Sequence, residues 1–204
     1  MPTHRGEPWG RVGPVPADVR VVRSNDQLWE LVNRCRRDGI AIPAVALLGG
    51  DLMRSVGGSG DEGRLEGDVA LLPIDLVRVE ASDRCAWFAA HLVARGSWWF
   101  GPIMAIMNAE HRGLWDVAPR AHPNDGRVDV VTVSAAFNRR DRWRARGRLP
   151  HGLHVPHPSI EIRQRASHDV SFDRPTAIRL DDRAWATVRS LRIDVEPDAF
   201  IACV

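Results

Sequence analysis

The 204 residues include 28 basic and 26 acidic side chains, for a formal net charge of +2, and 44% of the residues are hydrophobic. This composition predicts a globular protein that buries its own core. All 28 basic side chains are arginine, but a charge so close to balance gives no field that would select nucleic acid. No stretch reaches the ~20 apolar residues of a membrane-spanning helix.

The cysteines and the first residues bear on the compartment. Cys35, Cys85 and Cys203 lie far apart and form no C-x-x-C pair, which argues against a disulfide framework and a zinc ribbon. The start, MPTHRGEPWGRVG, has no apolar segment of a secretory signal. We therefore expect a cytoplasmic protein that is at most peripheral to a membrane.

The first third of the chain predicts a short α/β segment. Residues 1–18 are rich in Pro and Gly and predict a loose arm. VRVV then predicts a strand, and Ser24 with Gln27 three residues later is a capping box that opens a helix ending at Gly39. IPAVALL predicts a buried strand, and GGDLMRSVGG a turn into a short helix. Residues 19–68 therefore predict a truncated α/β (βαβ) lobe.

Residues 69–204 show a different pattern, with many short apolar runs separated by turn signals. This spacing predicts an antiparallel β-sandwich, so the fold class is mainly β within an α+β chain. The runs are LLPIDLVRVEA, CAWFAAHLVA, PIMAIMN, RVDVVTVS, SIEIRQR, HDVSF, TAIRL, WATVRSLRIDV and AFIACV. The polar stretch AAFNRRDRWRARGRL interrupts them and predicts a solvated helix that crosses one end of the sheet.

Several polar groups are candidate sites, each with a simpler structural explanation. Gly49, Gly50 and Asp51 stand where a strand turns into a helix, a place that favours an anion, although Asp51 could equally be an N-cap. Asp181 and Asp182 could supply a general base, but a turn also favours aspartate. On local grounds we favour the structural explanation for both.

Two further features have their own alternatives. His151, His154 and His157 are three residues apart, and we expect them to bind backbone groups in a loop rather than zinc, since no acid or cysteine lies beside them. The cluster Trp98, Trp99 and Phe100 cannot all face one core, so it indicates an interface or a membrane-touching edge.

The order of the motifs carries more information than any one of them. GGDLMRSVGG is followed by LPIDLVRV, PRAHPNDGRVD, VPHPSIEI, RLDDRAW and a final PDAFIACV. This series resembles the diacylglycerol kinase and sphingosine kinase family, in particular the YegS-like lipid kinases, chiefly their C-terminal β-sandwich domain. The resemblance covers roughly residues 40–204, and its most specific part is residues 118–133.

The resemblance implies roles for individual residues. Asp181 would be the general base that deprotonates a lipid hydroxyl. Asp125 would be the side-chain ligand of a structural magnesium ion, for which hard oxygen ligands are suited. Gly49, Gly50, Asp51 and Arg54 would lie near the phosphates of ATP, in the cleft between the domains.

The chain also departs from the family pattern. No copy of the glycine-rich loop that grips ATP precedes Gly49, and the family's D-G-E motif is replaced by Asp181, Asp182 and Arg183. Asn124 stands in place of the first aspartate of the family's D-D-G loop. These departures predict an incomplete ATP site.

Three functions remain open. The first is a lipid-kinase-like protein with an incomplete ATP site that binds a lipid or a related ligand at a membrane surface. The second is an active kinase that uses ATP and magnesium to phosphorylate a diacylglycerol-like hydroxyl, with a partner subunit or an unfamiliar loop supplying the nucleotide site. The third is a structural or regulatory subunit, for which a homodimer is a reasonable state because a sandwich can expose strand edges.

Overall fold

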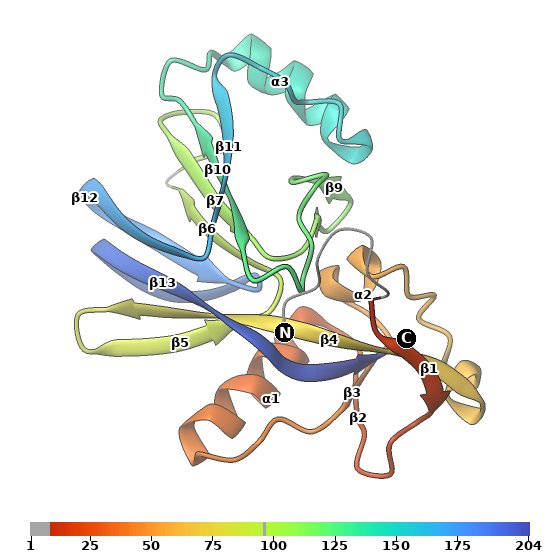
Figure 1. Ribbon diagram of the computed structural model, residues 1–204. Helices are drawn as coiled ribbons and strands as arrows, with labels where there is room; N and C mark the ends of the chain where they lie inside the picture. The colour runs from red at the N-terminus through yellow and green to blue at the C-terminus, as the bar shows by residue number, and fades with distance from the viewer. Residues whose placement is uncertain (1–8, 96) are drawn as a thin grey trace.

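The computed structural model describes residues 9–95 and 97–204 (Figure 1). The strands of these residues form one 11-stranded sheet and a separate hairpin of β8 and β9. The elements in chain order are β1 (Arg11–Pro14), β2 (Arg20–Val22), α1 (Asn25–Asp38), β3 (Val45–Leu47), α2 (Asp51–Ser55), η1 (Glu62–Glu66), β4 (Asp68–Ala81), β5 (Arg84–Phe88), β6 (His91–Arg95), β7 (Ile103–Met107), β8 (His111–Arg112), β9 (Trp115–Asp116), β10 (Val128–Val133), α3 (Arg139–Arg148), η2 (Leu149–His151), β11 (Ile160–Arg165), β12 (Ser167–Leu180) and β13 (Arg183–Cys203).

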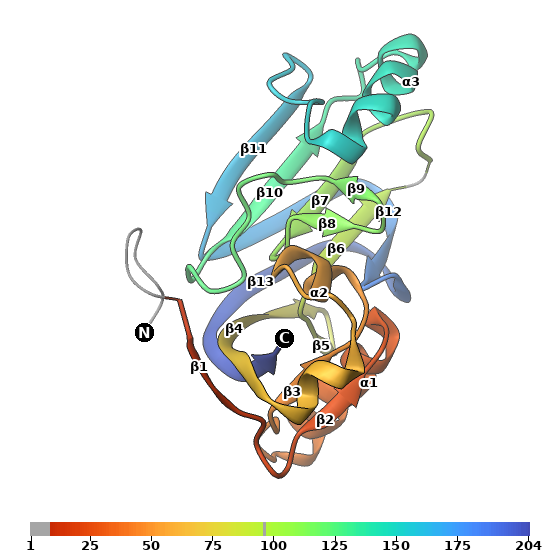
Figure 2. The ribbon, with the colours of Figure 1, turned by 90° about the vertical axis from the view of Figure 1, so that its right-hand side faces the viewer.

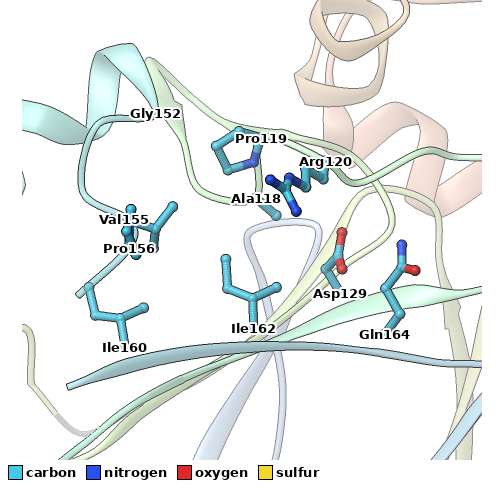
Figure 3. A pocket seen from close by; sticks show the side chains of 10 residues that line it. All are labelled: Ala118, Pro119, Arg120, Asp129, Gly152, Val155, Pro156, Ile160, Ile162 and Gln164. Carbon is cyan, nitrogen blue, oxygen red and sulfur yellow. The ribbon is translucent and has the colours of Figure 1, made fainter. Parts of the chain in front are cut away.

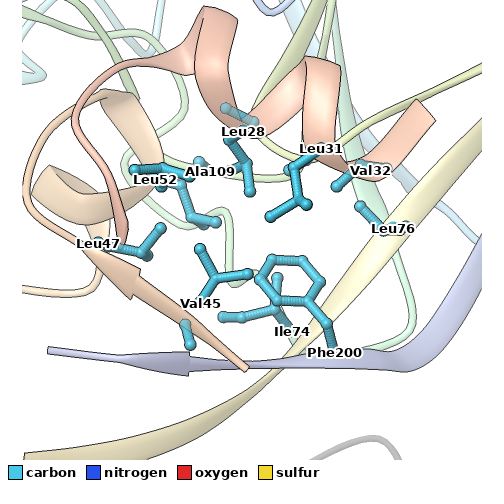
Figure 4. Close-up of a cluster of buried hydrophobic side chains, with 14 of the residues drawn as sticks. Leu28, Leu31, Val32, Val45, Leu47, Leu52, Ile74, Leu76, Ala109 and Phe200 are labelled. Carbon is cyan, nitrogen blue, oxygen red and sulfur yellow. The ribbon is translucent and has the colours of Figure 1, made fainter. Parts of the chain in front are cut away.

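The α/β lobe is continuous with the large sheet. Strand β3 pairs in parallel with β2 on one side and with the end of β13 on the other. The expected cap of α1 is present, since the Ser24 hydroxyl accepts from the N–H of Gln27 and the Gln27 side chain accepts from the N–H of Arg23. Leucines of α1 and α2 pack with Val45, Ile74 and Phe200 from the sheet (Figure 4). This shared core fixes the β2–α1 and β3–α2 turns against the sandwich.

The remaining strands form an antiparallel sheet that folds back on itself. Its order is β1-β4-β13-β12-β6-β7-β10-β11, with β5 beside β4. Val79 and Phe88, from β4 and β5, share one buried cluster with Ile106 and Val130, from β7 and β10. Two layers of the same sheet therefore enclose a core, and the expectation of a mainly β protein is confirmed.

Two strands are longer than the sequence pattern indicated. HDVSF and TAIRL are parts of the single strand β12, and WATVRSLRIDV and AFIACV are parts of β13. The turn signals between them, Pro175 and the Pro197–Asp198 pair, lie where the register shifts between Ser171 and Thr176 and between Glu196 and Phe200. A β-bulge accommodates proline without ending the strand.

Part of the segment expected to be a loose arm forms a strand. Residues 1–8 lie outside the described residues, but Arg11–Pro14 form β1, which pairs with β4 from Asp68 to Leu71. The polar helix crossing one end of the sheet is present as α3 (Figure 1). The expected domain boundaries at residues 18 and 68 stay a prediction.

Candidate functional site

The turn between β12 and β13 consists of Asp181 and Asp182, with φ angles of 45° and 67°. Asp181 is 2% exposed. Its Oδ1 accepts from the N–H groups of Ala90 and His91, and its Oδ2 from the N–H of Ala89, each at 2.9 Å. Burial raises the pKa of Asp181, against the opposing effects of the His91 ring and these N–H groups. The carboxylate therefore holds the turn to the junction of β5 and β6.

Asp182 is the more accessible acid of this turn. Its side chain is 42% exposed, and its Oδ1 accepts from the Arg112 guanidinium at 2.5 Å. Its Oδ2 lies 3.7 Å from Nε2 of His91. Of the two aspartates, Asp182 is the one whose carboxylate a ligand could reach.

A buried histidine and a second aspartate lie next to it. His91 Nε2 is 2.8 Å from Oδ2 of Asp51, and both residues are buried. The Asn25 amide donates to the same oxygen, and the N–H of Gly113 donates to Oδ1. Burial raises the pKa of Asp51, but the His91, Asn25 and Gly113 contacts outweigh it and leave that pKa below its ordinary value. Asp51 is therefore held as a carboxylate.

Asp51, His91 and Asp182 together could hold a metal ion. One ligand atom from each lies within 4.8 Å of the others. A cation on Nε2 would place the ring proton on Nδ1, which is buried and has no hydrogen-bond partner. The two carboxylates are therefore the stronger part of this set, and hard cations prefer such oxygen ligands.

The glycines before α2 have a structural role. A Cβ on Gly49 would lie 2.3 Å from the carbonyl oxygen of Arg23, and one on Gly50 would lie 2.6 Å from the Asn25 side chain. Gly50 also has a φ of 95°, a conformation that other residues rarely adopt. Both glycines thus let the β3–α2 turn approach the β2–α1 turn. Arg54 is exposed on α2, and phosphate binding by these residues stays a prediction.

The β2–α1 turn has none of the features of a phosphate-gripping loop. Arg23 and Ser24 connect β2 to α1 without a glycine, and Arg23 is paired with Glu62 at 2.5 Å. A hollow of about 360 Å³ lies beside this turn. Its lining includes three acids, Asp26, Asp181 and Asp182, which oppose a polyphosphate.

The LPID segment of β4 and the turn of residues 123–126 meet at Asp75. This side chain is fully buried, and its oxygens accept from the Asn124 amide and from the N–H groups of Gly126 and Asp198. Burial raises the pKa of Asp75. The AHPNDG turn is therefore held to β4 and to the bulge of β13 by one carboxylate.

A cavity of about 630 Å³ lies on the outer face of β10 and β11 (Figure 3). Ile160, Ile162 and Pro119 line its apolar part, and Asp129 points into it near Arg120 (Figure 3). Asp129 is 3% exposed, its Oδ2 has no hydrogen-bond partner, and burial raises its pKa to about 6. The neighbouring Asp125 adds to that rise.

Asp125 itself is half-buried beside this cavity. Its Oδ1 accepts from the N–H of Arg127, and burial raises its pKa. It does not belong to the metal-capable group formed by Asp51, His91 and Asp182. The assignment of Asp125 as a magnesium ligand stays a prediction.

The three histidines behave as loop residues. His154 is buried, with Nε2 at 3.1 Å from the carbonyl oxygen of Val117, and His157 Nδ1 accepts from the N–H of Ser159. Within residues 9–95 and 97–204, no metal-capable group includes any of them. The expectation that they bind backbone groups is met by His154 and His157.

His91 was not singled out by the sequence analysis. It lies in the apolar run AAHLVA, where a lone histidine has no motif around it. The only sequence signal was a titratable side chain within an apolar run that predicts a buried strand. Its partners, Asp51 and Asp182, come from turns 40 and 91 residues away, so spacing alone could not connect them.

Comparison with known proteins identifies the fold. No protein-family model matches the chain, and no curated protein matches it. The chain is similar to the crystal structure of a diacylglycerol kinase from Bacillus anthracis, with a TM-score of 0.70 and 14% identity over 91% of this chain and 75% of that one. Two putative diacylglycerol kinases from the same organism give TM-scores of 0.67 and 0.69 at 13% identity, over 91% of this chain and 77% of theirs. The chain therefore has the diacylglycerol-kinase-like fold that the motif order suggested.

Proposed function

We propose that this chain is a diacylglycerol-kinase-like protein that binds a lipid alcohol or a related amphipathic ligand and does not transfer phosphate from ATP. The observation that carries the proposal is the engagement of Asp181. All three of its hydrogen bonds are accepted from backbone N–H groups, so the acid expected to serve as general base is used to hold a turn. A general base must be within hydrogen-bond reach of the proton it removes.

The nucleotide side of the site agrees with this proposal. Phosphoryl transfer depends almost entirely on positioning phosphates and metal ions. The β2–α1 turn lacks glycine, and the hollow beside it is lined by three acids and a single arginine, Arg23, which is paired with Glu62. Gly49 and Gly50 are packed against that same turn, where an added Cβ on either would meet Arg23 or Asn25, so both glycines are explained by this packing.

The ligand side has a suitable cavity. A space of about 800 Å³, within the usual range for ligand pockets, is lined by apolar groups of β6, β7 and β12, among them Ala94, Met104 and Phe172. It lies where the register of β12 against β13 shifts between Ser171 and Thr176. A cavity of this size with an apolar lining could admit an acyl chain.

Binding can be tested with the full chain and phosphatidylcholine vesicles with and without diacylglycerol. We expect diacylglycerol to increase co-sedimentation. Thr187→Trp, which places an indole at the cavity wall, should remove that increase. Ile201→Trp, at an exposed position of the same strand that pairs with Pro73 of β4 and does not line the cavity, should preserve it. Equal binding to both vesicles by all three proteins would contradict the proposal.

The Asp51, His91 and Asp182 group favours a second candidate, a metal-dependent lipid kinase. Here Asp182 would take the role expected for Asp181, since it is the accessible acid of the turn. This candidate predicts magnesium-dependent formation of a phosphorylated lipid that Asp182→Asn abolishes. If no phosphorylated lipid forms, this second candidate is wrong, and the ligand-binding proposal is unaffected.

A further inference from the structure

Helix α3 has an exposed face of arginines around one tryptophan. Five of its arginines are exposed, against a single aspartate, and these are Arg139, Arg140, Arg144, Arg146 and Arg148. Trp143 lies among them with 69% of its surface exposed. On a helix, Arg139 and Arg140 lie one turn before Trp143 and Arg146 one turn after it. The apolar ring is thus surrounded by positive charge.

A buried arginine fixes this helix to an exposed aromatic loop. Arg142 is 1% exposed, and its guanidinium donates to the carbonyl oxygens of Trp98, Gly101 and Phe137. The loop therefore presents Phe100, which is 61% exposed, beside the helix, with the Arg139 guanidinium 5.2 Å from its ring centre. Such a contact builds a defined surface from two separate segments.

Two more exposed apolar residues belong to segments next to α3. Leu153 follows α3 and is 65% exposed, and its N–H donates to the carbonyl of Arg148. Leu114, at the tip of the β8–β9 hairpin, is 72% exposed. Figure 2 shows the β8–β9 hairpin between α3 and α2, and the Arg146 guanidinium of α3 lies 6.0 Å from the ring centre of Trp115 in this hairpin. Phe100 also lines the cavity of about 800 Å³, so this surface adjoins the proposed ligand site.

We infer that α3 and the Phe100 loop form a docking surface for anionic phospholipid bilayers. Arginines next to a negatively charged membrane surface each favour binding, and amphipathic aromatic rings lie at the headgroup level. Scattered exposed Trp, Phe and Leu side chains fit a deformable lipid surface better than the charged backbone of a nucleic acid. This inference rests on the proposed function and adds the surface through which the protein would contact the membrane that contains the ligand.

The test uses the full chain with vesicles of phosphatidylcholine alone and of phosphatidylcholine with phosphatidylserine. We expect binding only to the anionic vesicles, with release by added salt. Arg140→Glu with Arg144→Glu should weaken that binding about tenfold or more, given the contribution of each basic residue near the surface. Trp143→Ser should also weaken it but leave the salt dependence unchanged.

Matched controls separate this surface from overall charge. Arg34→Glu with Arg37→Glu makes the same charge change on the exposed side of α1 and should leave binding intact. Unchanged melting temperatures exclude unfolding as the cause of any loss. Equal binding to neutral vesicles, equal loss in both arginine pairs, or binding of an RNA oligonucleotide without vesicle binding would each overturn the inference.

The same vesicles distinguish this inference from the proposed function. Diacylglycerol-dependent binding that ignores phosphatidylserine and the α3 substitutions would support the ligand proposal and overturn the docking surface. Phosphatidylserine-dependent binding that ignores diacylglycerol and Thr187→Trp would do the reverse.

Discussion

Asp129 makes the folded protein sensitive to pH in a direction opposite to that of most surface acids. Burial and the nearby Asp125 raise its pKa from 3.8 to about 6, and its Oδ2 has no partner. Below pH 4 the group is protonated in both folded and unfolded chains and costs nothing. Between pH 4 and 6 only the unfolded chain releases the proton, so stability falls as pH rises.

The size of this effect follows from the pKa. The rise from 3.8 to about 6 is roughly two units, so it corresponds to about 3 kcal/mol of lost stability above pH 6. Asp129→Asn removes the charge while keeping the shape. We therefore expect this variant to be more stable than the parent by up to about 3 kcal/mol at pH 8 and to match it near pH 4.

Urea unfolding of both proteins at a series of pH values measures this difference. Asp173→Asn, at an exposed acid, serves as the control and should shift the curves little at any pH. A difference between Asp129→Asn and the parent that does not grow between pH 4 and 6 would refute the reasoning. So would a variant that is less stable than the parent at pH 8.

The remaining predictions concern buried polar groups. Asp181→Ala leaves three backbone N–H groups without an acceptor and should lower the free energy of unfolding by about 3 kcal/mol or more. Asp182→Ala should cost less than about 1 kcal/mol, because this side chain is 42% exposed and water screens its ion pair with Arg112. Urea unfolding compares the two. Asp75→Ala should cost at least as much as Asp181→Ala and increase proteolytic cleavage in the AHPNDG turn, because it releases Asn124 and two backbone N–H groups. Arg142→Met should increase hydrogen exchange in residues 97–101 and weaken vesicle binding, with little effect on exchange in β4; unchanged exchange in that loop would argue against the arginine contact.

Short sequence motifs predicted the elements that depend on contacts between residues close together in the chain. The Ser24 hydroxyl caps α1 as the S-x-x-Q pattern indicated, Gly39 ends this helix with a φ of 66°, and the polar run around Trp143 forms α3. Pro175 and Pro197 were interpreted as turns between separate strands. Proline occurs both in turns and in β-bulges, and only the pairing with the neighbouring strand shows which of the two is formed. Strand lengths were therefore underestimated.

Less of the candidate site could be predicted from the sequence. The DDR motif pointed to the turn that contains both aspartates but not to which of them faces outward, since two adjacent residues at positive φ point in different directions. Asp181 was expected to act on a substrate, and its three N–H partners come from residues 89–91, far away in the chain. His91 gave no signal because its role depends on two turns that only the folded sheet brings together.

None of the described helices is long and apolar enough to cross a membrane. The proposed lipid contact is the α3 surface, which the vesicle experiment tests. The arginine content of this surface is visible in the sequence, but its connection to Phe100 through Arg142 is a tertiary contact.

The central claim is that this diacylglycerol-kinase-like fold binds a ligand without transferring phosphate. The most direct measurement incubates the full chain with ATP labelled at the γ-phosphate, magnesium and vesicles containing diacylglycerol, and follows label in the extracted lipid. We predict no labelled lipid and no release of phosphate above a blank without protein. Labelled lipid that appears with the parent chain and disappears with Asp182→Asn would contradict it.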